Sequence, residues 1–158
     1  MQTATQQHWA DELIHLYAKD LGGRGLGKFS DSEHFLSALS LLRKSKNILI
    51  LTGFLIADQN APETDGPPGA MTLVRALLSL GKSVTVMSDP ENGPLIRACA
   101  ESLKVEEHFN LILIQKSEEE KALDIVRVLS TDLLFSIERP GKNKNGRCLS
   151  MSGADLTD

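Results

Sequence analysis

Four short apolar runs recur along the later part of this chain, and they restrict its fold more than any other feature of the sequence. The runs occupy residues 48–51, 84–87, 111–114 and 133–137. Their length and apolar character are typical of strands that are covered on both faces of a sheet. Stretches with helical spacing of apolar residues follow the first three runs, near 70–80, 95–103 and 118–129. This alternation predicts parallel strands joined by right-handed crossover helices.

The expected fold class is therefore α/β, a Rossmann-like parallel sheet of about four strands with flanking helices. Two further helices are expected before the sheet. Apolar residues recur at three- and four-residue spacing from Trp9 to Tyr17, and a second helix starts near Ser32, which we expect to cap it. We expect residues 1–158 to form a single domain, with the helical segment 1–45 packing on the sheet.

The composition argues against several classes of partner. Aromatic residues make up only 4% of the chain, so a surface that stacks nucleic-acid bases is not expected. The net charge of −4 gives no long-range attraction for nucleic acid or for anionic membranes. No apolar run approaches the roughly 20 residues that span a bilayer. We therefore expect no nucleic-acid partner and no membrane association.

The cysteines and the N-terminal residues bear on the compartment. Cys99 and Cys148 show no metal-type spacing, which favours a reducing compartment over a disulfide framework. Residues 1–9 have neither a basic start nor an apolar signal core, and Asp11 and Glu12 argue against a transit peptide. The expected location is cytoplasmic, or the mitochondrial matrix if the source is eukaryotic.

The segment 63–70 reads Glu-Thr-Asp-Gly-Pro-Pro-Gly-Ala, between the first strand and the next helix. Ligands of open α/β sheets bind at the carboxyl ends of the strands, where this segment lies. The loop 52–69 that contains it is longer than the usual connection of about 2–6 residues. Glu63 and Asp65 could bind a substrate ammonium group or a divalent cation, or act as acid and base. The structural alternative is that they only complement the dipole of the following helix.

The glycines and prolines of this segment predict a close approach of backbone to a ligand. Gly66 and Gly69 permit close contact or a positive φ, and Pro67 and Pro68 fix the entry into the helix. Free backbone N–H groups at the start of that helix could hold a carboxylate or a phosphate.

Two other loops are expected at the same edge of the sheet. Glu138 and Arg139 directly follow the fourth strand, and Arg139 offers a planar fork of donors that suits a carboxylate. Alternatively, Arg139 pins its loop through a pair with an acid. Asp89 before Pro90 follows the second strand, where turn chemistry is an equally ordinary explanation.

A glycine-rich segment at 22–28 contains Arg24. It follows a helix rather than a strand and lacks the Gly-Lys-Ser/Thr ending, so it fails as a dinucleotide or Walker motif. Arg24 could still reach the strand edge as an anion ligand. The simpler interpretation is a flexible glycine joint.

Taken in order, these motifs resemble the C-terminal domain of the D-glutamate cyclase family. The resemblance rests on Gly-Arg-Gly-Leu-Gly at 23–27, Thr-Gly-Phe at 52–54, the segment 63–70, Ser-Ile-Glu-Arg-Pro-Gly at 136–141, Gly146, and Met-Ser-Gly at 151–153. It covers the chain from about Gly22 to Asp155. The segment 63–70 is the most specific of these motifs.

The resemblance implies a lyase that cyclises D-glutamate to 5-oxo-D-proline with loss of water. Such a reaction needs a carboxylate clamp, a base for the ammonium group and help for a poor leaving oxygen. Our hypothesis assigns the amine and its proton to Glu63, Asp65 and Glu138. Substrate binding is assigned to Arg24, Thr64, Gly66, Gly69 and Arg139. The sequence requires no cofactor, a divalent metal is compatible with it, and the expected partner is a small amino-acid substrate.

A second reading is a truncated or degenerate relative that binds a small acidic metabolite or a partner chain without catalysis. Family members carry a Tyr-Tyr-Asn-Met-Arg-Gly-like run where residues 148–153 read Cys-Leu-Ser-Met-Ser-Gly, and a later Gly-Asp-Gly-Gly-Asn-Glu-like segment is not found here. A nucleotide-binding module is a third reading, which Glu63 and Asp65 oppose electrostatically unless a metal intervenes. A small sheet also leaves an open strand edge, which predicts a homodimer or a swapped assembly.

Overall fold

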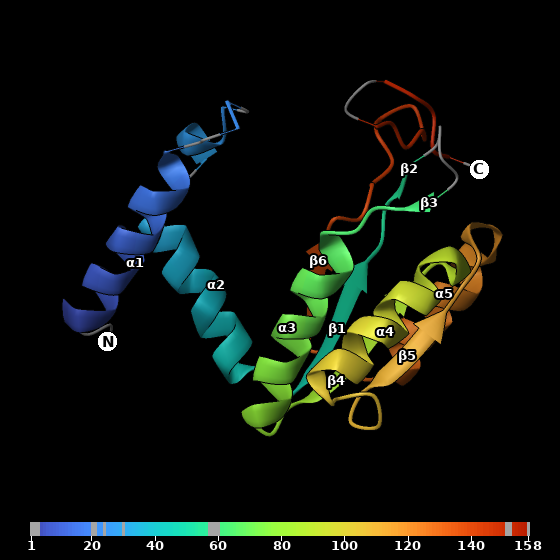
Figure 1. Ribbon diagram of the computed structural model, residues 1–158, viewed down its shortest axis with the longest axis horizontal. Helices are drawn as coiled ribbons and strands as arrows, with labels where there is room; N and C mark the ends of the chain where they lie inside the picture. Colours follow the sequence, from blue (N-terminus) through green and yellow to red (C-terminus); the bar gives the residue numbers. More distant parts are fainter. Residues whose placement is uncertain are drawn as a thin grey trace. The chain divides into compact units, whose positions relative to one another are not determined.

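The computed structural model describes residues 4–19, 22–23, 25–29, 31–56, 61–150 and 153–157. The chain divides into two compact units, Met1–Ser45 and Lys46–Asp158. Each unit is described by itself below (Figure 1). That the first unit packs on the second stays a prediction.

The second unit is built on a four-stranded parallel sheet with the order β5-β4-β1-β6. Its strands are β1 (Asn47–Thr52), β4 (Ser83–Ser88), β5 (Asn110–Leu113) and β6 (Leu133–Ile137). The predicted α/β class and the four apolar runs are confirmed. The order places β1 between β4 and β6, so the carboxyl ends of three neighbouring strands deliver Thr52, Ser88 and Ile137 to one edge.

Helices cover both faces of this sheet (Figure 1). On one face, α5 (Glu119–Val128) packs Ala122, Ile125 and Val126 against a core of Leu49, Met87 and Ile114. On the other face, α3 (Gly66–Ser79) and α4 (Gly93–Leu103) contact each other. They contribute fully buried side chains that include Met71, Val74 and Ile96. Because side chains alternate between two covered faces, the runs are mostly apolar, with Thr85 and Ser136 as the polar exceptions.

The strands differ in burial as their places in the sheet require. β1, with neighbours on both sides, is buried at most positions, and Leu49 and Ile50 have no exposed surface. β6 is an edge strand whose residues alternate between half-buried and exposed, and Leu134 is 49% exposed. β5 forms the opposite edge of the sheet.

A small hairpin interrupts the long connection from β1 to α3. It pairs β2 (Leu55–Ile56) with β3 (Ala61–Pro62) in antiparallel register. After it, the backbone N–H of Glu63 donates to the carbonyl of Phe54 at 2.8 Å. Helix α3 then begins at Gly66, earlier than the predicted start near residue 70, with prolines in its first turn. The hairpin was not predicted, because strands this short have no periodicity to detect.

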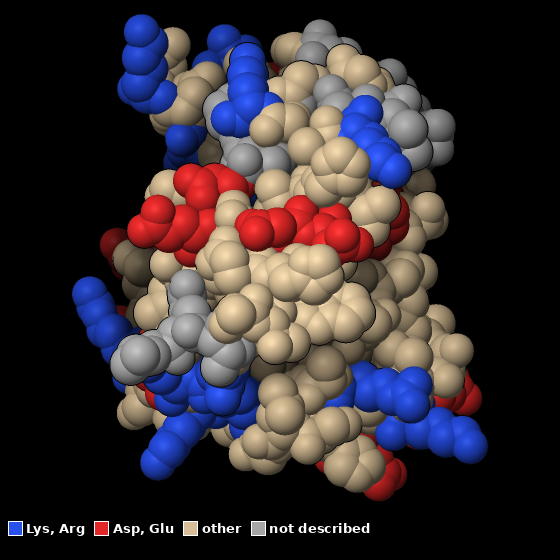
Figure 2. Space-filling view, turned by 90° about the vertical axis from the view of Figure 1, so that its left-hand side faces the viewer, with Lys and Arg blue, Asp and Glu red and all other residues tan. Residues whose placement is uncertain are grey.

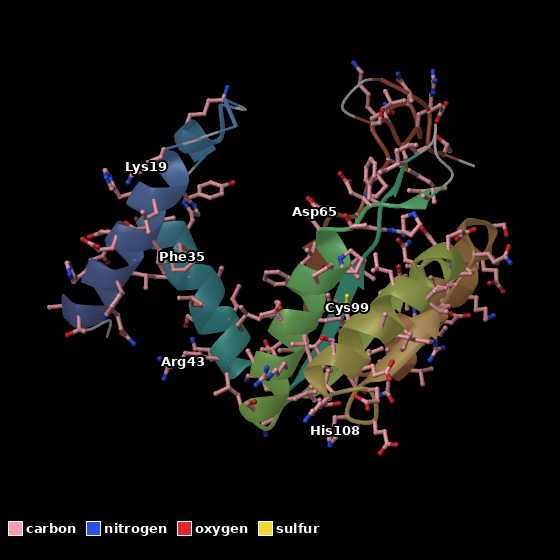
Figure 3. All side chains as sticks on the ribbon, viewed as in Figure 1. Lys19, Phe35, Arg43, Asp65, Cys99 and His108 are labelled. Atoms are coloured by element: carbon pink, nitrogen blue, oxygen red, sulfur yellow. The ribbon has the colours of Figure 1, made fainter. Side chains whose placement is uncertain are left out.

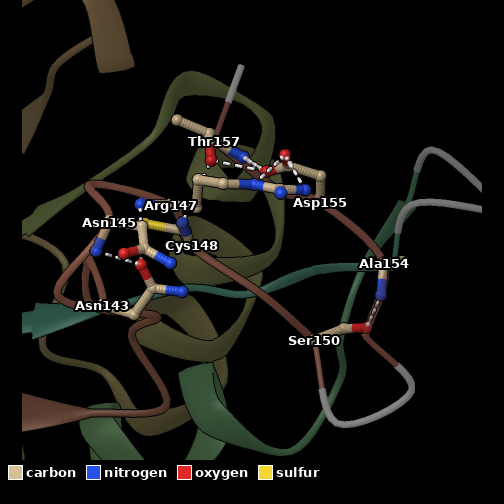
Figure 4. Close-up of polar contacts among 8 residues, drawn as sticks. All are labelled: Asn143, Asn145, Arg147, Cys148, Ser150, Ala154, Asp155 and Thr157. Carbon is tan, nitrogen blue, oxygen red and sulfur yellow. Dashed lines mark hydrogen bonds and ion pairs between the residues drawn. The ribbon is translucent and has the colours of Figure 1, made fainter.

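The segment after β6 is held by its own polar contacts (Figure 4). Asn143 Oδ1 accepts from the backbone N–H groups of Asn145 and Arg147. The Arg147 guanidinium pairs with Asp155 at 2.8 Å, and the Thr157 hydroxyl accepts from the N–H of Cys148. These contacts return the chain on itself, which buries Leu156 to 7% exposure.

The first unit contains α1 (Ala4–Ala18), the short 3-10 helix η1 (Leu26–Phe29) and α2 (Ser32–Lys44). The predicted cap of α2 was wrong. Asp31, not Ser32, accepts from the N–H groups of Glu33 and His34, at 2.7 and 3.4 Å. Asp31 has extended backbone that aims its carboxylate at the first turn, whereas Ser32 is already helical.

Two surface properties bear on partners. Within the described residues, every helix is too short or too polar to cross a bilayer. Figure 2 shows Lys and Arg side chains and Asp and Glu side chains on the same face, so neither sign of charge covers that face alone.

Candidate functional site

Three carboxylates meet above the carboxyl ends of β1 and β6. Glu63 follows β3, Asp65 precedes α3, and Glu138 follows β6 directly. One oxygen from each lies within 4.8 Å of the others. Figure 3 labels Asp65 at the first turn of α3. We call Glu63, Asp65 and Glu138 the carboxylate cluster.

Local structure fixes two members of the cluster. Asp65 is the N-cap of α3, and its carboxylate accepts from the N–H of Gly66 at 3.1 Å. Glu138 has a positive φ of 47°, a left-handed conformation that costs a residue with a side chain about 1 kcal/mol or more. That conformation ends β6 and places Glu138 against the start of α3.

The absence of a side chain at Gly66 lets the helix and Glu138 meet. A Cβ atom at Gly66 would lie 2.8 Å from Glu138 Oε2 and 3.0 Å from Glu138 Cβ. Real Cβ atoms do not approach other atoms so closely, so any other residue would displace Glu138. The expected close approach at Gly66 is therefore present, although its partner is a side chain of the same chain.

The cluster concentrates negative charge. The pKa of Glu138 is raised to about 7, first by loss of hydration, then by a hydrogen bond with Asp65 and by the charges of Asp65 and Glu63. The N–H of Gly66 acts in the opposite direction. Every charged side chain that shifts this pKa is another carboxylate.

The start of α3 offers no open anion site, contrary to our expectation. Gly66 donates its N–H to the carboxylate of Asp65, and Pro67 and Pro68 have no N–H to donate. The N–H of Gly69 bonds to the carbonyl of Asp65 at 3.3 Å. The chain's own groups thus occupy the donors that a substrate carboxylate would need.

Arg139 is bound to an acid of the chain. Its two terminal nitrogens donate to the two carboxylate oxygens of Asp89, with Nη2 at 2.7 Å from Oδ1. The Asp89 side chain is 8% exposed and that of Arg139 is 27% exposed. This bidentate pair ties the end of β6 to the end of β4, as the structural alternative for Arg139 expected.

The Asp89–Arg139 pair borders a cavity of about 450 Å³, which lies beside Leu51, Met87 and Ile114. These apolar residues belong to the side of the sheet that α5 covers. Glu63, Asp65 and Glu138 do not line the cavity. Glu138 and Arg139 are adjacent in sequence, but Glu138 belongs to the carboxylate cluster and Arg139 lines the cavity.

Two buried polar side chains near the carboxyl ends of the strands have no hydrogen-bond partner. Thr52 ends β1 and Asn92 precedes α4, and both are 0% exposed. Thr52 Oγ1 and both amide atoms of Asn92 are unpaired. Gly53, between them, has φ +114°, and a Cβ there would lie 2.5 Å from Asn92 Nδ2. Unsatisfied buried polar atoms are rare and often mark a place where a ligand or water binds.

A sequence model of the family described as D-glutamate cyclase-like, C-terminal, matches residues 13–158. The chain belongs to this family. The human D-glutamate cyclase, mitochondrial, is 39% identical over 80 residues, which are 49% of this chain and 13% of the human protein. The chain thus matches a small part of the length of that D-glutamate cyclase.

The predicted site residues of this D-glutamate cyclase-like chain fall into three groups. Glu63, Asp65 and Glu138 come together, with Gly66 against Glu138. Thr64 and Gly69 are exposed beside them. Arg139 is paired with Asp89, and Arg24 lies outside the described residues.

Sequence reasoning missed Thr52 and Asn92 as candidate site residues of this family member. A signal for Thr52 was present, because it ends the first strand and precedes a glycine. Asn92 had no comparable signal, since its place beside Gly53 depends on how the segment after β4, which contains η2 (Pro90–Asn92), folds. Chemically, the arrangement offers carboxylates that can accept protons, hold an amine or bind a hard metal cation.

Proposed function

We propose that this chain carries a lyase site of the D-glutamate cyclase type, which converts D-glutamate to 5-oxo-D-proline and water. The observation that supports this most is the carboxylate cluster, with its oxygens within 4.8 Å at the edge where parallel sheets bind ligands. Membership of the D-glutamate cyclase-like family supplies the reaction class.

The reaction places specific demands on such a site. The amine nitrogen attacks the carbon of the side-chain carboxyl group, a C–N bond forms, and a C–O bond breaks. Two protons leave the nitrogen, and the oxygen departs as water. Carboxylates suit this chemistry because they attract the ammonium group and accept its protons.

The three acids have distinct places in this proposal. Asp65 is held by the N–H of Gly66, and Glu138 is held by a hydrogen bond with Asp65 and by the same N–H. Glu138 is exposed and lies beside Asp65, where it can meet a substrate. Glu63 is half-buried and completes the negative surface that attracts the amine.

The clamp for the substrate carboxylates stays a prediction. Arg139 is engaged by Asp89, so it would have to exchange one carboxylate for another. Arg24 remains the other candidate from the sequence.

Incubation of the purified chain with D-glutamate, followed by chiral chromatography for 5-oxo-D-proline, tests the proposed activity. We expect turnover that exceeds the buffer rate and a much slower reaction with L-glutamate. Glu138→Gln should lower kcat, and the matched control Glu107→Gln should not, because Glu107 is exposed in the turn before β5. A folded chain without turnover, with and without divalent metal, would overturn the proposal.

Calorimetry with D-glutamate and 5-oxo-D-proline separates the second reading from the first. Binding without turnover would identify a non-catalytic relative that recognises a small acidic metabolite. This chain matches only 13% of the human protein, so similarity to that protein does not decide between catalysis and binding alone.

A further inference from the structure

The charges at the proposed site do not suit its substrate. D-glutamate carries one more carboxylate than ammonium group at neutral pH, and the cluster adds three acids within 4.8 Å. The donors at the start of α3 are occupied by Asp65 or are absent at the prolines. The guanidinium of Arg139 is held by Asp89. The residues that the structure describes at this site therefore leave a substrate carboxylate without a cationic partner, which a bound cation would supply.

A second observation points to the same place. Thr52 Oγ1 is completely buried and has no hydrogen-bond partner. The point that a Gly66 Cβ would occupy lies 3.4 Å from Thr52 Oγ1 and 2.8 Å from Glu138 Oε2. The two oxygens thus lie against the same side of Gly66, which places the unpaired hydroxyl next to the cluster. An unpaired hydroxyl next to carboxylates lacks the hydrogen-bond partner or cation that would satisfy it.

We propose that the carboxylate cluster and Thr52 bind one divalent cation of the Mg²⁺ or Mn²⁺ type. All the protein atoms that the site offers are oxygens, which these hard cations prefer over nitrogen or sulfur. Zinc would favour cysteine or histidine. Mg²⁺ is commonly bound by a few carboxylates and completes its octahedron with water and substrate oxygens.

The cation would supply the positive charge that a substrate carboxylate needs at this site. One oxygen from each acid holds the metal, and the second oxygen of each remains able to accept a proton. The open coordination positions bind the reacting carboxylate of the substrate and draw electron density from its carbon. This role rests on the proposed function, whereas binding of the cation does not.

Titration of metal-free residues 1–158 with Mn²⁺, followed by electron paramagnetic resonance and calorimetry, tests the site. We expect one bound Mn²⁺ that Mg²⁺ displaces. Glu63→Gln and Asp65→Asn should each weaken binding more than about tenfold, since both keep the shape of the side chain. Asparagine also remains a good N-cap, so Asp65→Asn leaves α3 capped. Thr52→Val should cause a smaller loss, and Glu107→Gln should cause none.

The outcomes distinguish this inference from the proposed function. Absence of Mn²⁺ binding, or equal binding by a folded Glu63→Gln/Asp65→Asn/Glu138→Gln triple variant, would overturn the cation site. Turnover that persists in excess chelator would overturn the role of the cation in the reaction and leave the lyase proposal standing. Specific Mn²⁺ binding without turnover would support the cation site and count against the lyase.

Discussion

Glu138 combines two unfavourable features in one residue. Its backbone is left-handed, with φ 47°, and its carboxylate faces Asp65 and Glu63. Neither feature helps the fold, because an ordinary surface residue at the end of β6 would avoid both. Strain of this kind tends to accumulate where a site requires a particular placement of a side chain.

This crowding predicts an unusual pH dependence for the metal-free protein. The folded pKa of Glu138 is about 7, above its ordinary value of 4.5, so the folded state binds the proton more tightly than the unfolded state. Stability should therefore fall as pH rises from about 4.5 to about 7. Urea unfolding in excess chelator measures this change.

Glu138→Gln is the matched variant, because it removes the charge and keeps the shape. It should be more stable than the natural chain at pH 8 and nearly equal at pH 4. Glu138→Gly should gain about 1 kcal/mol more by relieving the left-handed strain. Equal pH profiles for the natural chain and Glu138→Gln would contradict this account.

Gly66 and Gly69 lie in the same turn of α3 and provide a second contrast. A Cβ at Gly66 would meet Glu138, whereas a Cβ at Gly69 has nothing within 4 Å. Gly66→Ala should displace Glu138 and weaken Mn²⁺ binding. Gly69→Ala should leave Mn²⁺ binding unchanged and stabilise the helix by up to about 1 kcal/mol. Calorimetry and thermal unfolding of the two variants decide this, and equal Mn²⁺ affinities would refute the role of Gly66.

At the scale of elements, the Asp89–Arg139 pair joins the ends of β4 and β6. Asp89→Asn should destabilise the fold by about 2 kcal/mol, because it leaves a partly buried guanidinium with one neutral partner. The exposed pair Asp124–Arg127 is the control, and Asp124→Asn should cost less than about 0.5 kcal/mol. Urea unfolding compares them, and similar losses would show that the buried pair is not special.

The elements were predicted where the pattern is local. Apolar runs and helical spacing identified the sheet and its helices, because buried strands leave a direct trace in the sequence. The β2–β3 hairpin, the early start of α3 and the Asp31 cap were not anticipated, since one or two residues decide each. Strand order depends on crossovers between distant segments, which a single sequence does not reveal.

The candidate site was partly readable for the same reason. Convergence of strand ends in a parallel sheet places Glu63, Asp65 and Glu138 at one edge, and the structure brings them together. Whether Arg139 would meet a substrate or Asp89 depended on which way each side chain turns after its strand. The unpaired state of Thr52 and Asn92 is a property of packing, so no sequence pattern carries it.

At the scale of the whole molecule, the division at Ser45 has a direct consequence. The carboxylate cluster, Thr52 and the Asp89–Arg139 pair all lie in Lys46–Asp158. Residues 46–158 expressed alone should therefore fold and bind Mn²⁺ with the affinity of the whole chain. Circular dichroism and calorimetry test this, and an unfolded fragment would show that the helices of Met1–Ser45 are needed to complete the fold.

The open edges of the sheet keep a homodimer as a prediction. Among the described residues, no strand pairs with the outer side of β5 or β6, and Leu134 on β6 is 49% exposed. Light scattering over a range of concentrations measures the assembly state of the whole chain.

The pairing of β6 with β1 has a consequence for how the molecule is assembled. Asp65 and Glu138 are distant in sequence, and register between β1 and β6 brings them together. A cation that binds both would bind only chains in which β6 has taken its place at the edge of the sheet. The metal would then stabilise the last strand in the sheet against local unfolding. The concentration of free cation would therefore set the rate at which β6 detaches from β1.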